Sequence, residues 1–151
     1  NNKEFEQNMI SVGWKREQPW CTYFAELVWK EAYRNYKQHT ILNELDMLFS
    51  GSATATYNSF SKSNWEVGPI PMLGSIVIFQ KYKLGKPTWM GHAGIVIGND
   101  DKIFFSIDGN TGNGANNRDG DGIYDKKRPL DFSKKENGLV LINFIYPKQI
   151  V

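Results

Sequence analysis

The sequence predicts an α+β fold in which a helical first half packs on one face of a mainly antiparallel β-sheet. Apolar residues recur with a 3.6-residue period between Trp20 and Tyr36, which predicts a helix at about 19–37. The second half contains short β-branched and aromatic runs bounded by glycine, asparagine, aspartate or proline, which are typical of strands. A chain of 151 residues has the size of one domain, so a single domain is expected over 1–151.

The helical half is predicted to contain two helices followed by a loop. Pro19 suits the first turn of the helix at 19–37, where the N–H that proline lacks would have no helical partner. A shorter helix is predicted around 41–50 and ends at Gly51. The next segment is polar and closes with glycine and prolines up to Pro71, so it is predicted to be a loop.

The strand-rich half is predicted to form an antiparallel meander. Its expected strands lie at 75–80, 93–98, 102–108 and 139–145, with a further candidate at 122–127. Because Asn99–Asp101 is a short turn, the second and third of these strands should form a hairpin. The glycine- and asparagine-rich segment 109–121 is predicted to be an irregular loop, and such loops often carry function.

Composition excludes several classes of protein. The formal net charge of +2 is too small to indicate nucleic-acid binding, and no apolar run approaches the roughly 18–20 residues that span a bilayer. A single cysteine excludes an internal disulfide and a multi-cysteine zinc site, and two histidines leave little for a metal cluster. The segment RDGDG at 118–122 lacks the glutamate spacing of a calcium loop, so no metal is expected.

The position of Cys21 gives the first indication of chemistry. It lies at the expected start of the first long helix, where free N–H groups and the helix dipole favour an anion. A thiolate at such a place has a lowered pKa and is a good nucleophile at neutral pH. A lone cysteine also packs as a small apolar residue, so position alone leaves both roles open.

Two later motifs supply partners for a cysteine nucleophile. His92 begins a predicted strand, where an imidazole close to a thiol could hold it as an ion pair and protonate a leaving amine. Asp108 ends the next strand, so the hairpin should return it to His92, and Asp108 or Asn110 could orient the imidazole. The order Cys, His, Asp/Asn is that of papain-like acyl-transfer enzymes.

The remaining candidates have simpler explanations. His39 follows the first helix and is expected to be solvated. The basic residues Lys126, Lys127 and Arg128 are expected at a solvated strand end, with attraction of substrate carboxylates as the alternative.

The motifs around Cys21, His92 and Asp108 resemble those of one enzyme family. PWCTYFAELVWKEAY, from Pro19, resembles the nucleophile helix of the CHAP amidases, the cysteine- and histidine-dependent amidohydrolase/peptidases related to NlpC-type peptidases. GHAGIVIG resembles their histidine strand, and GPIPMLGSIVIFQ the strand entry before it, with Ser75 where an aspartate is usual. FFSIDGNTGNG followed by RDGDGIY resembles their glutamate–glycine–asparagine strand, with Asp108 where a glutamate is more usual. The resemblance runs to Tyr124 but is poor over 38–66.

The resemblance implies a papain-like domain that hydrolyses an amide bond of peptidoglycan through a thioester, without a metal or organic cofactor. It assigns Cys21 as the nucleophile, His92 as the base and then acid, and Asp108, Asn110 or both as the orienting group. The implied partners are peptidoglycan stem peptides, and the implied place of action is the bacterial cell wall, reached as a secreted, periplasmic or phage-delivered protein. For a toxin, an immunity or inhibitor protein beside Cys21 is a natural partner.

Several questions stay open at the level of sequence. Trp20 and Trp89 flank the proposed nucleophile and base, so they are expected to form walls of a substrate groove, with core packing as the alternative. A non-catalytic cell-wall or protein binding module, and a papain-like protein transferase or deamidase, are the other function classes. The bond cleaved and the oligomeric state are not predicted.

Overall fold

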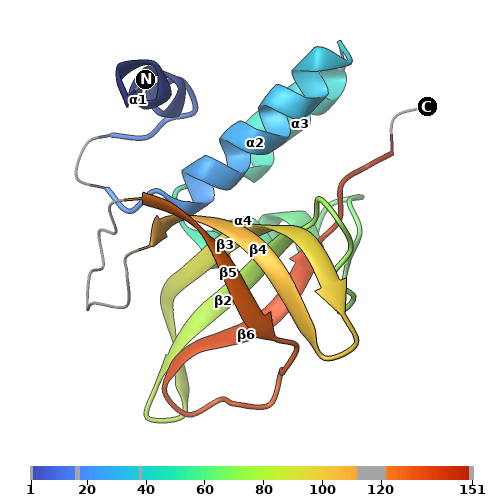
Figure 1. Ribbon diagram of the computed structural model, residues 1–151. Helices are drawn as coiled ribbons and strands as arrows, with labels where there is room; N and C mark the ends of the chain where they lie inside the picture. The colour runs from blue at the N-terminus through green and yellow to red at the C-terminus, as the bar shows by residue number, and fades with distance from the viewer. Residues whose placement is uncertain (1, 16–17, 38, 112–121, 150–151) are drawn as a thin grey trace.

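The computed structural model describes residues 2–15, 18–37, 39–111 and 122–149. Within this part of the chain there are four helices and one six-stranded sheet, and the second and fourth helices pack on the sheet (Figure 1). The helices are α1 (Asn2–Ser11), α2 (Cys21–Asn35), α3 (His39–Leu48) and α4 (Ala53–Ser61). The strands are β1 (Val67–Gly68), β2 (Ile76–Lys83), β3 (Lys86–Asp100), β4 (Ile103–Thr111), β5 (Gly122–Pro129) and β6 (Gly138–Ile145). The predicted α+β class is confirmed.

Strands β2 to β5 form an antiparallel meander, and β6 returns to pair with β2 at the other end of it. Its strand order is β1-β6-β2-β3-β4-β5, and each neighbouring pair is antiparallel. The predicted hairpin is present, with Ile95 opposite Ile107 and Asp100 opposite Ile103. The candidate strand at 122–127 is also present as β5.

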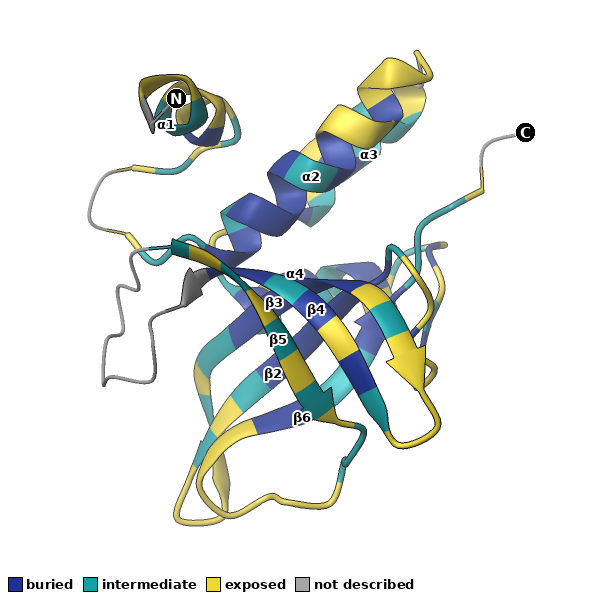
Figure 2. Cartoon of the chain, in the orientation of Figure 1, coloured by how far each residue is buried: buried dark blue, intermediate teal, exposed yellow. Residues whose placement is uncertain are grey.

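A first core lies between the helices and one face of the sheet, where Figure 2 shows buried positions along α2 and across the middle of the strands. Trp29 at its centre stacks on Trp65 and meets Phe60 edge-on, so α2, α4 and the segment before β1 share one aromatic cluster. The buried members are Ala25, Trp29, Tyr33, Leu45, Phe49, Ala53, Phe60, Trp65, Ile76, Ile78, Ala93, Ile95 and Ile145.

A second core fills the other, concave face of the sheet. Phe104 on β4 and Phe144 on β6 are separated by two strands, yet their ring centroids lie 5.3 Å apart. The sheet therefore curls strongly. The two cores explain why β2 has a continuous apolar run in place of alternation: Ile76 and Ile78 face the helices, whereas Val77 and Phe79 face the concave side.

The structure corrects two predictions in the helical half. The helix expected at 19–37 begins at Cys21, so Pro19 precedes it and does not occupy its first turn. The segment expected to be a loop up to Pro71 contains α4 and β1. Its serine and threonine content was interpreted as a loop signal. One of these residues instead starts the helix, because the Ser52 hydroxyl accepts a hydrogen bond from the Ala55 N–H and caps α4.

Helix α1 was not predicted from the sequence. Its Met9 is buried, and its Phe5 packs on Trp20 and Phe24 at the start of α2. Of the predicted loop at 109–121, the first residues extend β4, and 112–121 lie outside the described residues. In the part of the chain described here, no helix combines the length and the apolar character needed to cross a membrane.

Candidate active site

Cys21 is the first residue of α2, the longest helix, and is only 6% exposed. Trp20 occupies the N-cap position, and its side chain makes no capping hydrogen bond. The first turn also contains no acidic residue. The N–H groups at the start of a helix attract negative charge, and the first turn holds no carboxylate that would compete for them. The helix therefore favours a thiolate at Cys21.

His92 and Asp108 are joined across the β3–β4 hairpin. The imidazole Nε2 lies 2.7 Å from Oδ2 of Asp108, and both side chains are buried. The predicted return of Asp108 to His92 is thus confirmed. It follows from the register: with Ile95 opposite Ile107, Asp108 lies diagonal to His92 on the same face of the sheet.

Gly94 makes room for the Asp108 carboxylate. A Cβ atom on Gly94 would lie 2.2 Å from Oδ1 of Asp108, closer than any non-bonded contact. The glycine in the GHAG motif is therefore a spatial requirement of the His92–Asp108 pair.

Two further side chains hold Asp108. The Ser106 hydroxyl donates to Oδ1 at 2.6 Å, and Nη2 of Arg128 donates to Oδ2 at 2.7 Å. The Arg128 guanidinium also lies 4.6 Å from the centre of the Phe79 ring, a cation–π contact that fixes its position. Arg128 was expected to be solvated at the end of a strand. That expectation is wrong, because β5 directs the Arg128 side chain at Asp108.

The Cys21 thiol and the His92 imidazole line the same cleft and interact closely enough for each to shift the pKa of the other, so the two groups are neighbours. Since Nε2 of His92 faces Asp108, the other ring nitrogen, Nδ1, is the one available to sulfur. The Thr22 hydroxyl lies 3.8 Å from the same sulfur. The imidazole thus bridges a thiol on a helix and a carboxylate on a neighbouring strand.

The electrostatics of the three groups favour an ion pair. Burial by itself would raise the pKa of the Cys21 thiol, but the hydrogen bond and charge of His92 lower it below its ordinary value. Burial opposes the charged form of His92 too, yet hydrogen bonds to Asp108 and Cys21 raise the pKa of His92 to about 9. Burial is likewise outweighed at Asp108, where His92 and Arg128 lower the carboxyl pKa.

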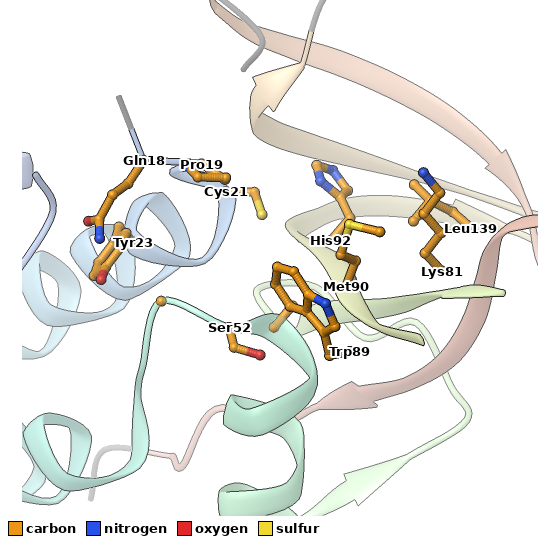
Figure 3. A pocket seen from close by; sticks show the side chains of 13 residues that line it. Gln18, Pro19, Cys21, Tyr23, Ser52, Lys81, Trp89, Met90, His92 and Leu139 are labelled. Atoms are coloured by element: carbon orange, nitrogen blue, oxygen red, sulfur yellow. The ribbon is translucent and has the colours of Figure 1, made fainter. Parts of the chain in front are cut away.

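A cleft of about 340 Å³ opens beside Cys21 and His92 (Figure 3). One wall comes from the start of α2 and the segment before α4, and the other from β3, β2 and β6. The lining residues are Gln18, Pro19, Cys21, Tyr23, Gly51, Ser52, Ala53, Lys81, Trp89, Met90, Gly91, His92 and Leu139.

The two tryptophans expected to form groove walls have different environments. Trp89 lines the cleft and is 69% exposed. Trp20 is not among the described residues of the lining, and its ring packs edge-on against Phe5 and Phe24. A Cβ atom on Gly109 of β4 would lie 2.8 Å from the Trp20 ring. The structure therefore places Trp20 in the packing between α1, α2 and the sheet, so its expected place in the groove wall is corrected.

The other predicted candidates lie elsewhere. His39 is exposed at the start of α3, as expected. Ser75 is buried and donates a hydrogen bond to the Met72 carbonyl. Asn110 lies in β4, but its side chain is outside the described residues, as is the RDGDG segment up to residue 121. Among described residues, no three histidine, cysteine, aspartate or glutamate side chains are placed to hold a metal ion.

Sequence patterns did not predict that Ser106 and Arg128 hold Asp108, or that Lys81 lines the cleft. Arg128 had a usable signal: on an edge strand with period-two alternation, Tyr124, Lys126 and Arg128 share a face. That this face meets Asp108 follows only from the pairing of β4 with β5.

Comparisons with models of known protein families, with curated proteins and with solved structures found no match. The function is therefore inferred from the geometry of the side chains and from the sequence motifs.

Proposed function

We propose that this protein is a cysteine-dependent hydrolase of amide bonds, with peptidoglycan as its substrate class. The observation that carries the proposal is that His92, at the edge of a cleft, is hydrogen-bonded to Asp108 and lies beside Cys21. A nucleophile, a base and an orienting carboxylate in this arrangement are the parts of an acyl-transfer triad.

The reaction begins from the thiolate–imidazolium pair. The Cys21 sulfur attacks the carbonyl carbon of the substrate amide, and a C–S bond forms while the carbonyl electrons move to oxygen. The backbone N–H of Cys21 and its neighbours in the first turn of α2 are the donors for that oxyanion, because the first N–H groups of a helix lack helical partners.

His92 then acts as the acid. It gives the Nδ1 proton to the departing amine, the C–N bond breaks, and a thioester to Cys21 remains. The neutral imidazole next takes a proton from a water molecule, whose oxygen attacks the thioester carbonyl. Cleavage of the C–S bond releases the carboxylic acid and restores the thiolate.

Asp108 orients His92 throughout this cycle. Its Oδ2 accepts a hydrogen bond from Nε2–H, so Nδ1 stays directed at sulfur and the imidazolium is stabilised. Ser106 and Arg128 each donate to the carboxylate, which keeps this buried group ionised and fixed. In this mechanism Ser106 and Arg128 are positioning residues.

Peptidoglycan is proposed from the resemblance of the cysteine and histidine motifs to the CHAP amidases, and the papain-like arrangement is part of the same proposal. A helix-borne cysteine beside a histidine on a meander supports it. The cell wall is the place of action that follows.

Replacement of the nucleophile tests the proposal. Cys21→Ala should reduce hydrolysis of purified peptidoglycan at least about 10³-fold while the circular dichroism spectrum is unchanged, because loss of a triad nucleophile removes covalent catalysis. Product masses from defined muropeptides identify the bond that the wild-type protein cleaves.

The matched control is Thr22→Ala, which removes the neighbouring hydroxyl and leaves the thiol. Activity of Cys21→Ala equal to that of the wild type would show that the nucleophile is another group. Cleavage or acyl transfer on protein substrates alone would favour a papain-like protein transferase or deamidase.

A further inference from the structure

The cleft beside Cys21 is electrostatically asymmetric. The polar side chains on the wall formed by α2 and the start of α4 are neutral: Gln18, Tyr23 and Ser52. The opposite wall contains Lys81 of β2, whose ammonium is the one charged group in the described lining outside the Cys21–His92 pair. Figure 3 shows Lys81 on the far side of His92 from Cys21.

Lys81 has no carboxylate partner among the described residues. The buried Lys30 differs, because its ammonium pairs with both Glu26 and Asp46. The backbone at Lys81 is nevertheless well held: its carbonyl accepts the Thr88 hydroxyl at 2.7 Å, and its Cα lies opposite Leu139. An ordered strand thus presents to the cleft an ammonium that no described carboxylate neutralises.

The strand register sets how far the backbone of Lys81 lies from the backbone opposite His92. Phe79 lies directly opposite His92, and Lys81 follows it by two residues on the same strand. Two residues of a strand span about 7 Å. One residue of an extended peptide spans about 3.5 Å, so a substrate group that reaches the Lys81 backbone would lie at least about two residues from a carbonyl held at His92.

We propose that Lys81 makes this cleft selective for substrates that carry a free carboxylate on the β2 side of the scissile amide. The proposal rests on the proposed function and names the substrate class of the same site. A lysine ammonium is a strong donor to a carboxylate, and Trp89 and Met90 give the adjoining wall an apolar surface for the peptide beside it.

The main experiment compares two synthetic stem peptides that differ only in one group, a free side-chain carboxylate or the corresponding carboxamide. The ratio of their kcat/KM values should favour the carboxylate about 2- to 5-fold in the wild type, as expected for an exposed ion pair. Lys81→Gln should abolish this preference, Lys81→Glu should reverse it, and added salt should weaken it.

Lys83→Gln is the matched control, because Lys83 is an exposed lysine two residues farther along β2 and does not line the cleft. It removes the same charge from the same strand, so it should keep the wild-type preference. Equal kcat/KM values for the two peptides in the wild type, or the same preference in Lys81→Gln and Lys83→Gln, overturn the proposal.

A second readout does not depend on peptidoglycan hydrolysis. Cys21 is the only cysteine, so the rates of its alkylation by anionic iodoacetate and neutral iodoacetamide can be measured without other labelled sites. Lys81→Gln should lower the iodoacetate-to-iodoacetamide ratio, and Lys83→Gln should not. If the wild type cleaves neither these peptides nor purified peptidoglycan, the proposed function is wrong, and an unchanged alkylation ratio in Lys81→Gln rejects the role of Lys81 separately.

Discussion

At the scale of single residues, the site depends on how a buried carboxylate is satisfied. Asp108 is fully buried and would be costly as an isolated charge. It instead has three hydrogen-bond donors, from His92, Ser106 and Arg128. Because the charge of Asp108 stays in place, His92 can remain protonated beside a thiol whose pKa is lowered.

The pH dependence of the reaction follows from these shifts. The active form is the thiolate–imidazolium pair, so kcat/KM should be bell-shaped. Its alkaline limb should lie near 9, where His92 loses its proton, and its acid limb lies below the ordinary thiol value because the pKa of Cys21 is lowered. Asp108→Asn removes the charge that raises the pKa of His92, so the alkaline limb should move to lower pH.

Initial rates between pH 5 and 10 would check this prediction. The control is Asp125→Asn, which neutralises an exposed carboxylate on the neighbouring strand β5. An alkaline limb at the same pH in Asp108→Asn and the wild type would contradict the assignment of Asp108 as the partner of His92.

At the scale of elements, the hairpin of β3 and β4 determines which side chains meet. Its register sets His92 diagonal to Asp108, and a one-residue slip would move Asp108 to the opposite face of the sheet. Glycine at position 94 is compatible with this register because its missing side chain leaves the space that the carboxylate occupies.

Gly94→Ala should therefore displace Asp108. We expect activity to fall at least about 10-fold and the free energy of unfolding to fall by about 1–3 kcal/mol, the usual cost of an added methyl group in a packed site. Gly98→Ala on the same strand is the control, because its Cβ would lie 3.7 Å from the Phe105 ring, an ordinary contact. Activity assays and urea unfolding would measure both, and equal effects would contradict the prediction.

At the scale of the whole molecule, two cores on opposite faces of one curled sheet hold the site together. The helices cover one face and position Cys21, whereas the concave face contains Phe79, Phe104 and Phe144 beside the Asp108–Arg128 pair. The sheet must curl for β4 and β6 to share this second core. The site therefore depends on packing remote from the cleft.

Phe104→Ala tests the second core. Phe104 is fully buried, so its truncation should lower the free energy of unfolding by about 3–5 kcal/mol. The adjacent Phe105 is 37% exposed on the opposite face, and Phe105→Ala should cost about 1 kcal/mol. Urea denaturation of the two variants would measure the difference, and equal losses would show that the concave face is not a core.

Much of the candidate site could be predicted because its parts have local signals. Cys21 lies at the start of an amphipathic helix pattern. His92 lies at the start of a predicted strand, and Asp108 ends the strand that follows it after one short turn. Helix α4 was missed because its cap and short apolar period lie in a serine- and threonine-rich segment. Trp20 was misplaced because nearness in sequence to Cys21 says nothing about which way the ring packs.

The sequence by itself determined the α+β class, the hairpin and the candidates Cys21 and His92 with Asp108 or Asn110 beside them, because period, turn and order along the chain are local properties. Only the tertiary structure decided that Arg128 meets Asp108, that Gly94 leaves space for the carboxylate and that Lys81 faces the cleft. Each of these depends on strand register and on the curl of the sheet, which bring together residues that are distant in the chain.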